Sequence, residues 1–412
     1  MSSNLAGRTN SLTTDKVAAG EDMMAITNTA TSAGLAPNIA QSLAHDIAAT
    51  KAPINRARHL PGYMYTSPEI YDLEKEKIFM RDWLCVARAE EVTNPGDYMT
   101  FRLMNEPFIV ARAHDGTVHA YRNSCAHRGL VVAKESGSAK GFTCEYHGWS
   151  YDLTGQLVGA PFMDNVEDFD LSTCRLGTLC CEVWAGWVFV SFNAAVGPLS
   201  DDVALFEDQF AMLDMGACRT GDKQVWDLGC NWKIMDENNH DLYHIQATHA
   251  GTFGAGITTE GLGFNLHESG RFSAFYSDPP LVPEGKSVFG AMPWMKDQPG
   301  DFACLGHMPP NFGIVGRIDS VLAVLAWPVS LTETRLIVYQ LFPEEVFERP
   351  DLDEKMKVHH DFAHIVFEED TGIVVDTQEA VALASYQPGP ISRMEASIHH
   401  TFAHYLDRVF DA

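Results

Sequence analysis

The stretch NSCAHRGLVVAKESGSAKGFTCEYHGWSY, residues 123–151, organises the interpretation of this chain. It holds four soft metal ligands in two pairs, Cys125 with His127 and Cys144 with His147. Each pair is a short chelating loop, and the sixteen residues between the pairs are enough to bring the two loops face to face. Two thiolates and two imidazoles suit zinc, or a [2Fe-2S] cluster in which histidines replace cysteines on one iron.

The arrangement of these ligands favours the cluster. A zinc finger places its two histidines together on a helix after a C-x-x-C pair, whereas here each half supplies one cysteine and one histidine. If the thiolates bind one iron and the imidazoles the other, the histidine edge can pass electrons to another site. A zinc-stabilised binding protein stays open as the alternative.

These residues resemble the Rieske family, and most closely its oxygenase subunits. The family patterns C-x-H-R-G and C-x-x-H-G-W-x-Y appear as Cys125–Gly129 and Cys144–Tyr151. The resemblance covers roughly residues 60–380. It implies an α+β fold: a small antiparallel β Rieske domain, and a larger catalytic domain of antiparallel sheet flanked by helices in a helix-grip-like arrangement.

Length and charge narrow the class of protein. A chain of 412 residues has room for about two or three domains, and 46% hydrophobic with 20% charged residues is ordinary for a folded protein. The formal net charge of −26 argues against binding to nucleic acid or to an anionic membrane surface. It suits a partner with a complementary patch, or simply a solvated acidic surface.

Cysteine usage indicates the compartment. The nine cysteines are odd in number and mostly scattered, so they are not a disulfide framework. The N-terminus has no apolar signal-peptide region, and no run approaches the ~18 apolar residues that a spanning helix needs. We therefore expect a soluble protein of the reducing cytoplasm.

Hydrophobic periodicity divides the first half of the chain into three parts. Residues 1–55 are predicted to be an N-terminal extension: a loosely ordered tail with one short amphipathic helix over 38–50, rather than an arm that clasps a neighbouring subunit. Residues 56–85 hold a helix of the catalytic domain that starts at Ser67, whose hydroxyl can cap it. Residues 86–195 form the Rieske domain. Its strands are expected at 98–103, 107–112 and 118–122, with one buried closing strand at 183–192.

Residues 196–412 are predicted to form the catalytic domain. A helix is expected over 201–213, and the stretch 251–315 is rich in Gly, Pro and Phe and too irregular to be one element, as in long functional loops. Two strands and a mainly helical end follow, at 320–327, 334–342 and 351–406.

A second metal site is indicated within Asn231–His249, NWKIMDENNHDLYHIQATH. Asp241 and His244 are three residues apart, so a helix would present them on one face. His249 lies about 140° further round an ideal helix, so the helix must distort or end before both imidazoles reach one ion. Two histidines and a distant carboxylate leave one face of a metal open, which is how non-haem Fe(II) binds dioxygen. Without the first motif, a structural histidine pair would be the default interpretation.

The order and spacing of these residues resemble the α subunits of Rieske oxygenases. The pattern Glu237-x3-Asp241-x2-His244-x4-His249 matches the family, which implies that His244 and His249 bind a mononuclear iron. The third ligand should come from a late Glu-Asp pair. The sequence FEEDTGI at 367–373, with a glutamine after it, matches that pattern.

The resemblance thus implies Asp370 as the third iron ligand, with Glu369 and Asp376 as nearby rivals. Asn238 matches a residue that lies near the iron in relatives, but it is a poor candidate as a ligand.

Asp241 has a different role in the family. It bridges a cluster histidine of one subunit to an iron ligand of the next, because the two metals of one subunit are too far apart for electron transfer. Carried over, Asp241 would accept hydrogen bonds from His147 across an interface and from His244 in its own chain. This implies a head-to-tail homotrimer, with or without a separate β subunit.

The resemblance implies a terminal oxygenase that contains a [2Fe-2S] cluster and mononuclear Fe(II) and uses O2 as co-substrate. The chain has neither a G-x-G-x-x-G fingerprint nor a flavin-binding pattern, so electrons from NAD(P)H must arrive through a separate reductase, a ferredoxin or both. A pure Rieske electron carrier is the alternative outside the enzymes, but it has no use for the second histidine pair.

The sequence limits the substrate to a few chemical classes. Phe and Met residues between Thr252 and Met308 indicate an apolar cavity, which favours a small hydrophobic aromatic or alkyl-bearing substrate. The family both dihydroxylates rings and removes N- or O-alkyl groups by monooxygenation, with the same metals. Members that act on small quaternary amines offer a third class, which requires an aromatic cage.

Overall fold

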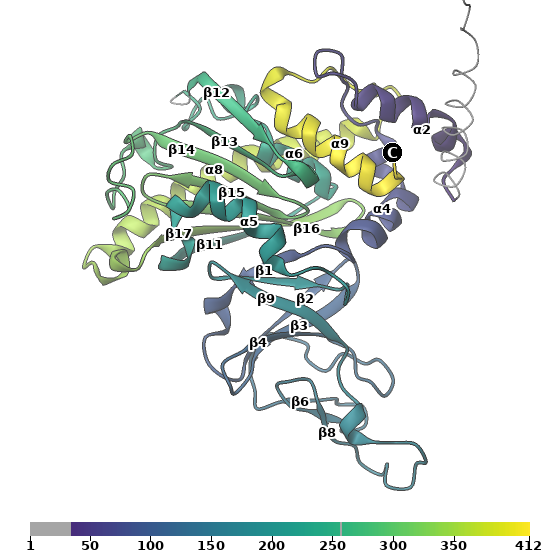
Figure 1. The fold of residues 1–412 in the computed structure, drawn as a ribbon. Helices are drawn as coiled ribbons and strands as arrows, with labels where there is room; N and C mark the ends of the chain where they lie inside the picture. The colour runs from purple at the N-terminus through teal and green to yellow at the C-terminus, as the bar shows by residue number, and fades with distance from the viewer. Residues whose placement is uncertain (1–33, 256–257) are drawn as a thin grey trace, which may run out of the picture.

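The computed structural model describes residues 34–255 and 258–412. Two β-sheet units lie one above the other in Figure 1, with the smaller unit at the bottom of the view. The prediction of an α+β protein, with a small antiparallel β domain and a larger domain of antiparallel sheet and helices, is confirmed. The first part of the predicted tail, residues 1–33, lies outside the described residues.

The smaller unit contains a seven-stranded sheet in the order β1-β10-β9-β4-β3-β2-β5 and a three-stranded sheet in the order β6-β7-β8. All neighbouring strands are antiparallel. The strands are β1 (Leu84–Arg88), β2 (Asp97–Leu103), β3 (Glu106–Arg112), β4 (Val118–Arg122), β5 (Gly137–Ser138), β6 (Phe142–Thr143), β7 (Ser150–Tyr151), β8 (Leu157–Gly159), β9 (Thr178–Trp184) and β10 (Trp187–Ser191). The three short strands predicted before the cluster motif are confirmed as β2, β3 and β4.

The predicted closing strand at 183–192 is wrong, because β9 and β10 form a hairpin there. Its two central residues, Ala185 and Gly186, have φ of 47° and 80°. Positive φ at both central residues is typical of a two-residue hairpin turn, whose twist matches that of the flanking strands. Bulky apolar residues continue on both sides of Ala-Gly, so the sequence reads as one uninterrupted strand.

The larger unit has a seven-stranded antiparallel sheet in the order β11-β17-β16-β15-β14-β13-β12. Its strands are β11 (Cys218–Leu228), β12 (Thr258–Leu266), β13 (Phe272–Ser277), β14 (Phe302–Met308), β15 (Phe312–Arg317), β16 (Val321–Ser330) and β17 (Glu333–Pro343). The strands predicted at 320–327 and 334–342 are confirmed as β16 and β17. The loop character expected for 251–315 is wrong, because β12 and β13 lie in it together with β14 and most of β15.

Glycines inside β14 and β15 hid these strands, and close packing against α5 (Leu199–Phe210) explains the glycines. A Cβ atom on Gly306 would lie 2.4 Å from the Phe210 ring, and one on Gly316 would lie 2.4 Å from the Leu213 side chain just after α5. Glycine within a strand marks such a close approach. One face of the sheet is therefore covered by α5.

The other face is covered by the helices α6 (Trp232–His240), α7 (Ile245–Thr248) and α8 (Leu352–Val381), with α8 against β11 and α6 against β16. The predicted helical C-terminus is confirmed in α8 and α9 (Ala396–Phe410). The N-terminal helices α3 (Tyr63–Thr66) and α4 (Pro68–Glu74) lie before the smaller unit in the chain, and Ser67 caps α4 as predicted by accepting the Ile70 N–H at 3.3 Å. Across the described ranges, no helix is long and apolar enough to cross a membrane.

The helix predicted over 38–50 is confirmed as α2 (Pro37–Thr50). It lies against α9 (Figure 1), and its residues Ile39 and Leu43 are buried. The expectation of a loosely ordered tail is therefore wrong for this helix, because its apolar face is packed on the C-terminal helix of the same chain.

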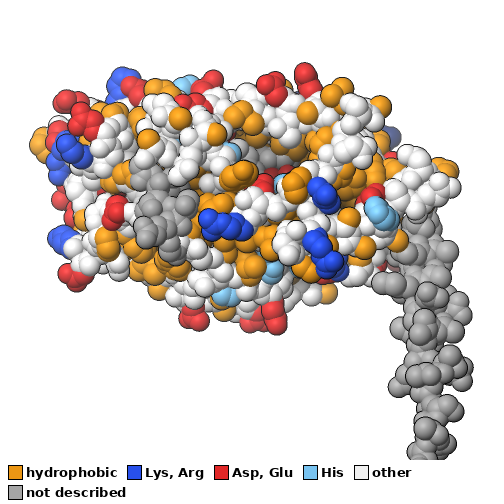
Figure 2. Space-filling model, turned by 90° about the horizontal axis from the view of Figure 1, so that it is seen from above, with side chains coloured by type: hydrophobic (Ala, Val, Ile, Leu, Met, Phe, Trp, Pro, Cys, Tyr) orange, Lys and Arg blue, Asp and Glu red, His pale blue; other side chains and the backbone are white. Residues whose placement is uncertain are grey.

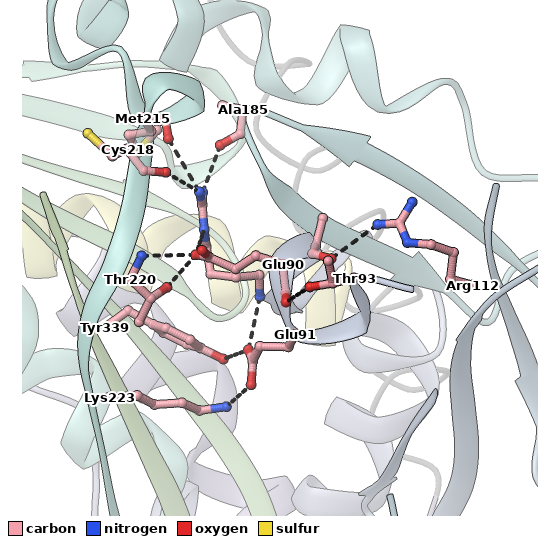
Figure 3. A network of polar contacts seen from close by, with 12 residues as sticks. Glu90, Glu91, Thr93, Arg112, Ala185, Met215, Cys218, Thr220, Lys223 and Tyr339 are labelled. Carbon is pink, nitrogen blue, oxygen red and sulfur yellow. Dashed lines mark hydrogen bonds and ion pairs between the residues drawn. The ribbon is translucent and has the colours of Figure 1, made fainter. Parts of the chain in front are cut away.

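A polar network at the end of β1 joins the two sheets (Figure 3). The buried Arg88 guanidinium donates to the carbonyl oxygen of Ala185 at 2.9 Å and to that of Cys218, in β11, at 2.8 Å. Glu90 and Glu91 contact side chains of β11 and β17, namely Thr220, Lys223 and Tyr339. The smaller unit is thus fixed to the edge of the larger sheet where β11 and β17 lie.

A buried carboxylate fixes the start of α6. Glu74, at the end of α4, is fully buried and accepts hydrogen bonds from Trp232 Nε1 at 2.7 Å, Lys233 Nζ at 2.5 Å and the Tyr405 hydroxyl at 2.7 Å. Burial lowers the pKa of Lys233, and the neighbouring Glu74 carboxylate opposes that shift. Asn231 caps α6 by accepting the Lys233 N–H at 3.1 Å. Three segments far apart in the sequence therefore meet at the first turn of α6.

Glu74→Gln is expected to lower the free energy of unfolding by about 3–5 kcal/mol, because it leaves the Lys233 ammonium buried without a counter-charge. Combining Glu74→Gln with Lys233→Met should recover most of that loss, since no uncompensated charge remains. Chemical denaturation followed by circular dichroism measures both variants. Equal losses in the single and double variants would mean that the ion pair is not what matters at this position.

Candidate functional site

The two cluster loops have the same local structure. In each loop the residue four positions after the cysteine is a glycine with positive φ, Gly129 at 81° and Gly148 at 73°. The N–H of each glycine donates to the carbonyl oxygen of its cysteine, at 2.8 Å to Cys125 and 2.9 Å to Cys144. Residues with a Cβ atom rarely adopt such φ, so the glycine spacing shapes both loops.

The four predicted cluster ligands lie on these loops, at the end of the smaller unit. Cys125 and Cys144 are buried, whereas His127 and His147 are exposed with their Nδ1 atoms 3.1 Å apart. The Tyr151 hydroxyl lies 3.1 Å from Cys125 Sγ. Buried thiols behind exposed imidazoles fit a [2Fe-2S] cluster whose histidine edge faces solvent. In Figure 1 this region, near β6 and β8, is remote from the larger sheet.

The spacing of these ligand atoms also separates the cluster from zinc. One zinc ion requires its ligand atoms to gather around a single centre. Among the described residues there are two groups of three side chains whose ligand atoms all lie within 4.8 Å of one another. Neither group contains Cys125, His127, Cys144 or His147. Ligands divided between two irons fit this wider arrangement.

The second motif contains the helix end that the spacing of its histidines allows. The helix α6 ends at His240, and the one-turn helix α7 lies between His244 and His249. The break comes at Asp241, whose Oδ1 accepts the backbone N–H of Tyr243 at 2.5 Å and that of His244 at 3.3 Å. Aspartate competes with the helix in this way, because its side chain satisfies nearby backbone donors.

The structure brings His244, His249 and Asp370 together. Asp370 Oδ1, on α8, lies 3.4 Å from His244 Nε2 and 3.2 Å from His249 Nε2. Ligand atoms about 2.1 Å from one ion and at right angles to each other stand about 3 Å apart. The three side chains therefore fit the facial arrangement of a mononuclear iron. Asn238, on α6, donates to Asp370 Oδ1 at 3.3 Å, so it lies beside these three side chains.

A carboxylate stands behind each imidazole. Asp241 Oδ2 lies 3.3 Å from His244 Nδ1, and Glu369 Oε2 lies 2.7 Å from His249 Nδ1. Burial lowers the pKa of His244, but the neighbouring Asp241 and Asp370 carboxylates outweigh burial and raise the pKa to about 9. The site therefore favours positive charge, as a divalent cation requires. The sequence indicated Glu369 only as a rival ligand, and its contact with His249 was missed.

A second group of two histidines and one carboxylate was also missed. His240, His307 and Asp236 are buried together, and His240 Nε2 lies 2.6 Å from His307 Nδ1. This distance is that of a hydrogen bond and is too short for two ligands of one ion. Burial lowers the pKa of His240 to about 3 and raises that of Asp236 well above its usual range. We interpret the group as a neutral structural network.

A largely apolar cavity lies beside His244, His249 and Asp370. Its wall is formed by side chains of the sheet, of α8 and of the chain around α7, including Phe253, Leu281, Leu305, Val315, Leu322, Val324 and Phe367. The predicted segment Thr252–Met308 supplies only part of this lining. The remainder comes from residues 238–249 and from β15, β16 and α8, and the sequence did not connect these three elements with the cavity.

A cluster-ligand set on a small antiparallel domain, followed by a site of two histidines and one carboxylate beside an apolar cavity, is the arrangement of a Rieske non-haem iron oxygenase. Two family models match the chain in that order: the Rieske [2Fe-2S] domain over residues 82–170 and the ring hydroxylating alpha subunit (catalytic domain) over residues 215–411. The chain belongs to the Rieske non-haem iron oxygenases as an α subunit. These enzymes bind a [2Fe-2S] cluster and a mononuclear iron, use O2, receive electrons from partner proteins and assemble with other subunits.

Similar proteins divide between two reaction types. The chain is 26% identical to choline monooxygenase, chloroplastic, of Arabidopsis thaliana over 85% of this chain and 82% of that protein. It is 32% identical to biphenyl 2,3-dioxygenase subunit alpha of Rhodococcus jostii over 55% of this chain and 54% of that protein.

Solved structures share the fold. A quaternary ammonium Rieske monooxygenase in complex with L-carnitine has a TM-score of 0.73 at 22% identity and covers 88% of this chain and 98% of its own. Naphthalene 1,2-dioxygenase with indole bound has a TM-score of 0.70 at 21% identity and covers 88% of this chain and 95% of its own.

Asp370→Asn is expected to remove the mononuclear iron while the two irons and two sulfides of the cluster remain. Glu369→Gln should keep the mononuclear iron but weaken its affinity by about 10–100-fold, because only the support of His249 is lost. Iron and acid-labile sulfide analysis after dialysis against a graded chelator measures both. Loss of iron in Glu369→Gln but not in Asp370→Asn would assign the ligand to the rival residue.

Glu237 gives a pH-dependent prediction for α6. It accepts the Tyr65 hydroxyl at 2.8 Å, and burial raises its pKa to about 7 from about 4.5. A carboxyl group with a raised folded pKa stabilises the fold below about pH 4.5, and this stability is lost as the pH rises to about 7. Glu237→Gln should therefore raise the melting temperature, relative to the unchanged protein, more at pH 8 than at pH 5. The opposite dependence in thermal unfolding would mean that Glu237 is charged in the folded protein.

Proposed function

We propose that this protein is the terminal oxygenase of a multicomponent Rieske system that hydroxylates a small hydrophobic aromatic or N- or O-alkyl aromatic substrate. The observation that carries the proposal is the apolar cavity beside His244, His249 and Asp370. When bound, the cluster supplies electrons and the mononuclear iron supplies the activation of dioxygen. The chain's own residues orient the ligands, hold the substrate and exclude water.

The proposed iron ligands are held by contacts on their outer sides. Glu369 accepts from the outer nitrogen of His249, and the Thr252 hydroxyl donates to the same Glu369 oxygen at 2.8 Å. The Phe253 ring stacks on the His249 imidazole with centroids 4.8 Å apart. These contacts fix the ring so that Nε2 points into the site, and the phenyl ring separates the imidazole from water.

We propose that Asp241 links neighbouring subunits in a head-to-tail homotrimer. Within one chain the cluster loops lie at the opposite end of the molecule from the iron site (Figure 1), which supports a partner subunit as the electron donor. The exposed edge of His147 is available to such a neighbour. Two exposed aromatic side chains stand beside the proposed contact points, Tyr146 next to His147 and Tyr243 between Asp241 and His244. Such exposed aromatic residues are typical of interface anchors.

We propose that a separate reductase, a ferredoxin or both deliver electrons from NAD(P)H in the cytoplasm. All nine cysteines lie in the described residues and are free, which suits a reducing compartment. Seen from above, the larger unit carries acidic side chains mostly around its margin, with hydrophobic and basic ones between them (Figure 2). The negative charge therefore does not form one patch on this face.

A monooxygenase that removes N- or O-alkyl groups is the second candidate. The alignments with choline monooxygenase and with glycine betaine monooxygenase of Chromohalobacter salexigens cover 85% and 81% of this chain, against 55% for biphenyl dioxygenase. Three aromatic side chains line the cavity, Phe253, Tyr276 and Phe367, and they supply part of the cage that a quaternary amine requires.

The experiment that tests the proposal is a screen of aromatic and N-alkyl compounds with the iron-loaded protein, a surrogate reductase and ferredoxin, NADH and 18O2. A product that gains two labelled oxygens indicates dihydroxylation, whereas loss of an alkyl group indicates monooxygenation. Oxygen from water instead of O2 in every product would contradict an oxygenase.

Asp241→Asn tests the proposed contact between subunits. Loaded with excess iron, the variant should keep three irons and two sulfides per chain, because Asp241 supports His244 without being a proposed ligand, yet lose product formation by at least about 100-fold. Glu268→Gln, an exposed carboxylate outside the site, is the matched control and should leave the rate unchanged. Unchanged coupling of NADH to product in Asp241→Asn would contradict the proposed link.

A further inference from the structure

One guanidinium interrupts the apolar wall of the cavity. Arg317 is the last residue of β15, lines the cavity and is only 5% exposed. The strand register pairs Tyr276 of β13 with Ala303 of β14, and Ala303 with Arg317. Paired residues on neighbouring antiparallel strands point to the same face. Tyr276 and Arg317 therefore stand on either side of a small methyl group on the cavity face of the sheet.

Arg317 is held on one edge and open on the other. Its Nε and Nη2 donate to Asp278 Oδ2 at 3.1 and 2.5 Å, and Nε also donates to the Pro279 carbonyl oxygen at 3.1 Å. Asp278 is 1% exposed, so this is a buried ion pair. Nη1 makes no hydrogen bond within the described residues. The ion pair therefore fixes the guanidinium plane and leaves two N–H donors on the edge turned away from Asp278.

The Tyr276 hydroxyl is a second hydrogen-bond donor on the cavity face of the sheet. Its hydroxyl makes no hydrogen bond to any described residue, and the side chain lines the cavity. Burial raises the pKa of Tyr276 above its usual range, so the hydroxyl keeps its proton. Two donors without protein partners in a largely apolar cavity favour a ligand that brings its own acceptor oxygens, because an unpaired buried donor is costly.

The donors lie one aromatic ring away from the proposed iron ligands. The Phe253 ring centroid is 4.8 Å from that of the His249 imidazole and 5.8 Å from the Arg317 guanidinium carbon. A ligand bound to Arg317 thus extends toward the metal site across Leu305, Val315 and Leu322.

We infer that the cavity takes an organic carboxylate, whose two oxygens accept hydrogen bonds from Arg317 Nη1 and the Tyr276 hydroxyl while its apolar body lies beside the metal site. The inference rests on the proposed oxygenase function and names the class of its substrate. Charge-assisted hydrogen bonds from a preoriented guanidinium are strong and directional. A substrate whose only charge is a cation forms no charge-assisted hydrogen bond with these donors.

The test is isothermal titration calorimetry of the holoenzyme with 4-methylbenzoate, with its neutral isostere 4-methylbenzamide and with choline, without reductant. We expect the carboxylate to bind at least about tenfold more tightly than the amide and choline not to bind. Equal affinity for carboxylate and amide, or a preference for choline, would overturn the inference.

Two variants test whether Arg317 and Tyr276 cause the preference for a carboxylate. Arg317→Gln with Asp278→Asn removes both charges of the ion pair together, so that neither remains buried alone. It should lose the preference for 4-methylbenzoate and keep its affinity for 4-methylbenzamide within about twofold. Tyr276→Phe removes only the hydroxyl and should weaken carboxylate binding by about three- to tenfold. An unchanged carboxylate preference in both variants would overturn the assignment.

A matched control removes an ion pair elsewhere in the same sheet. Arg335→Gln with Asp227→Asn deletes the exposed pair between β17 and β11 and should leave binding of all three ligands unchanged. Binding is measured without O2 chemistry, so failure of the oxygenase proposal and failure of this inference give different results. Carboxylate binding without any oxygenated product would contradict the proposed oxygenase function. Product from neutral substrates alone would contradict the carboxylate inference.

Discussion

The buried Glu74 carboxylate is the contact on which the metal site depends, because it fixes the helix that leads into that site. It receives donors from Trp232 and Lys233 at the first turn of α6 and from Tyr405 of α9. A buried ion pair adds little net stability on its own, since desolvation offsets attraction, but it strongly disfavours every arrangement that breaks it. The ion pair between Glu74 and Lys233 therefore fixes the position of α6 along its axis.

The position of α6 matters because α6 and α8 meet at both ends. Gln378 of α8 accepts the backbone N–H of Asn231 at 2.8 Å, and Asn238 donates to Asp370 at 3.3 Å. A shift of α6 along its axis would break both contacts and move Asp241 away from His244. The scaffold gathers three carboxylates and two imidazoles at this end, so it holds in advance a set of ligands that a bound metal cation would stabilise further.

The parts of the molecule that the sequence predicts are those with a fixed local spacing. The cluster loops depend on a cysteine, a histidine and a glycine within five residues, and Asp370 follows from a compact pattern on one helix. Long-range contacts leave no such pattern: nothing near Glu74 indicates that it meets Trp232, and nothing near Arg317 indicates a place in the cavity. The glycines of β14 and β15 led to the wrong prediction of a loop. They are needed for close packing against α5, which lies about a hundred residues earlier in the chain.

The two walls of the cavity separate metal binding from contact with the substrate. The proposed ligands come from the chain around α7 and from α8, whereas the opposite wall comes from alternate residues of β13 to β16. The intervening residues of β14 and β15 face α5 and are constrained by close packing, as at Gly306 and Gly316. A change at Val315 or Arg317 therefore alters the cavity without disturbing either the metal ligands or the α5 contact. This separation is a physical reason why proteins named for substrates as different as choline and biphenyl can share one catalytic fold, and why the wall of the sheet rather than the metal motif holds the information about the substrate.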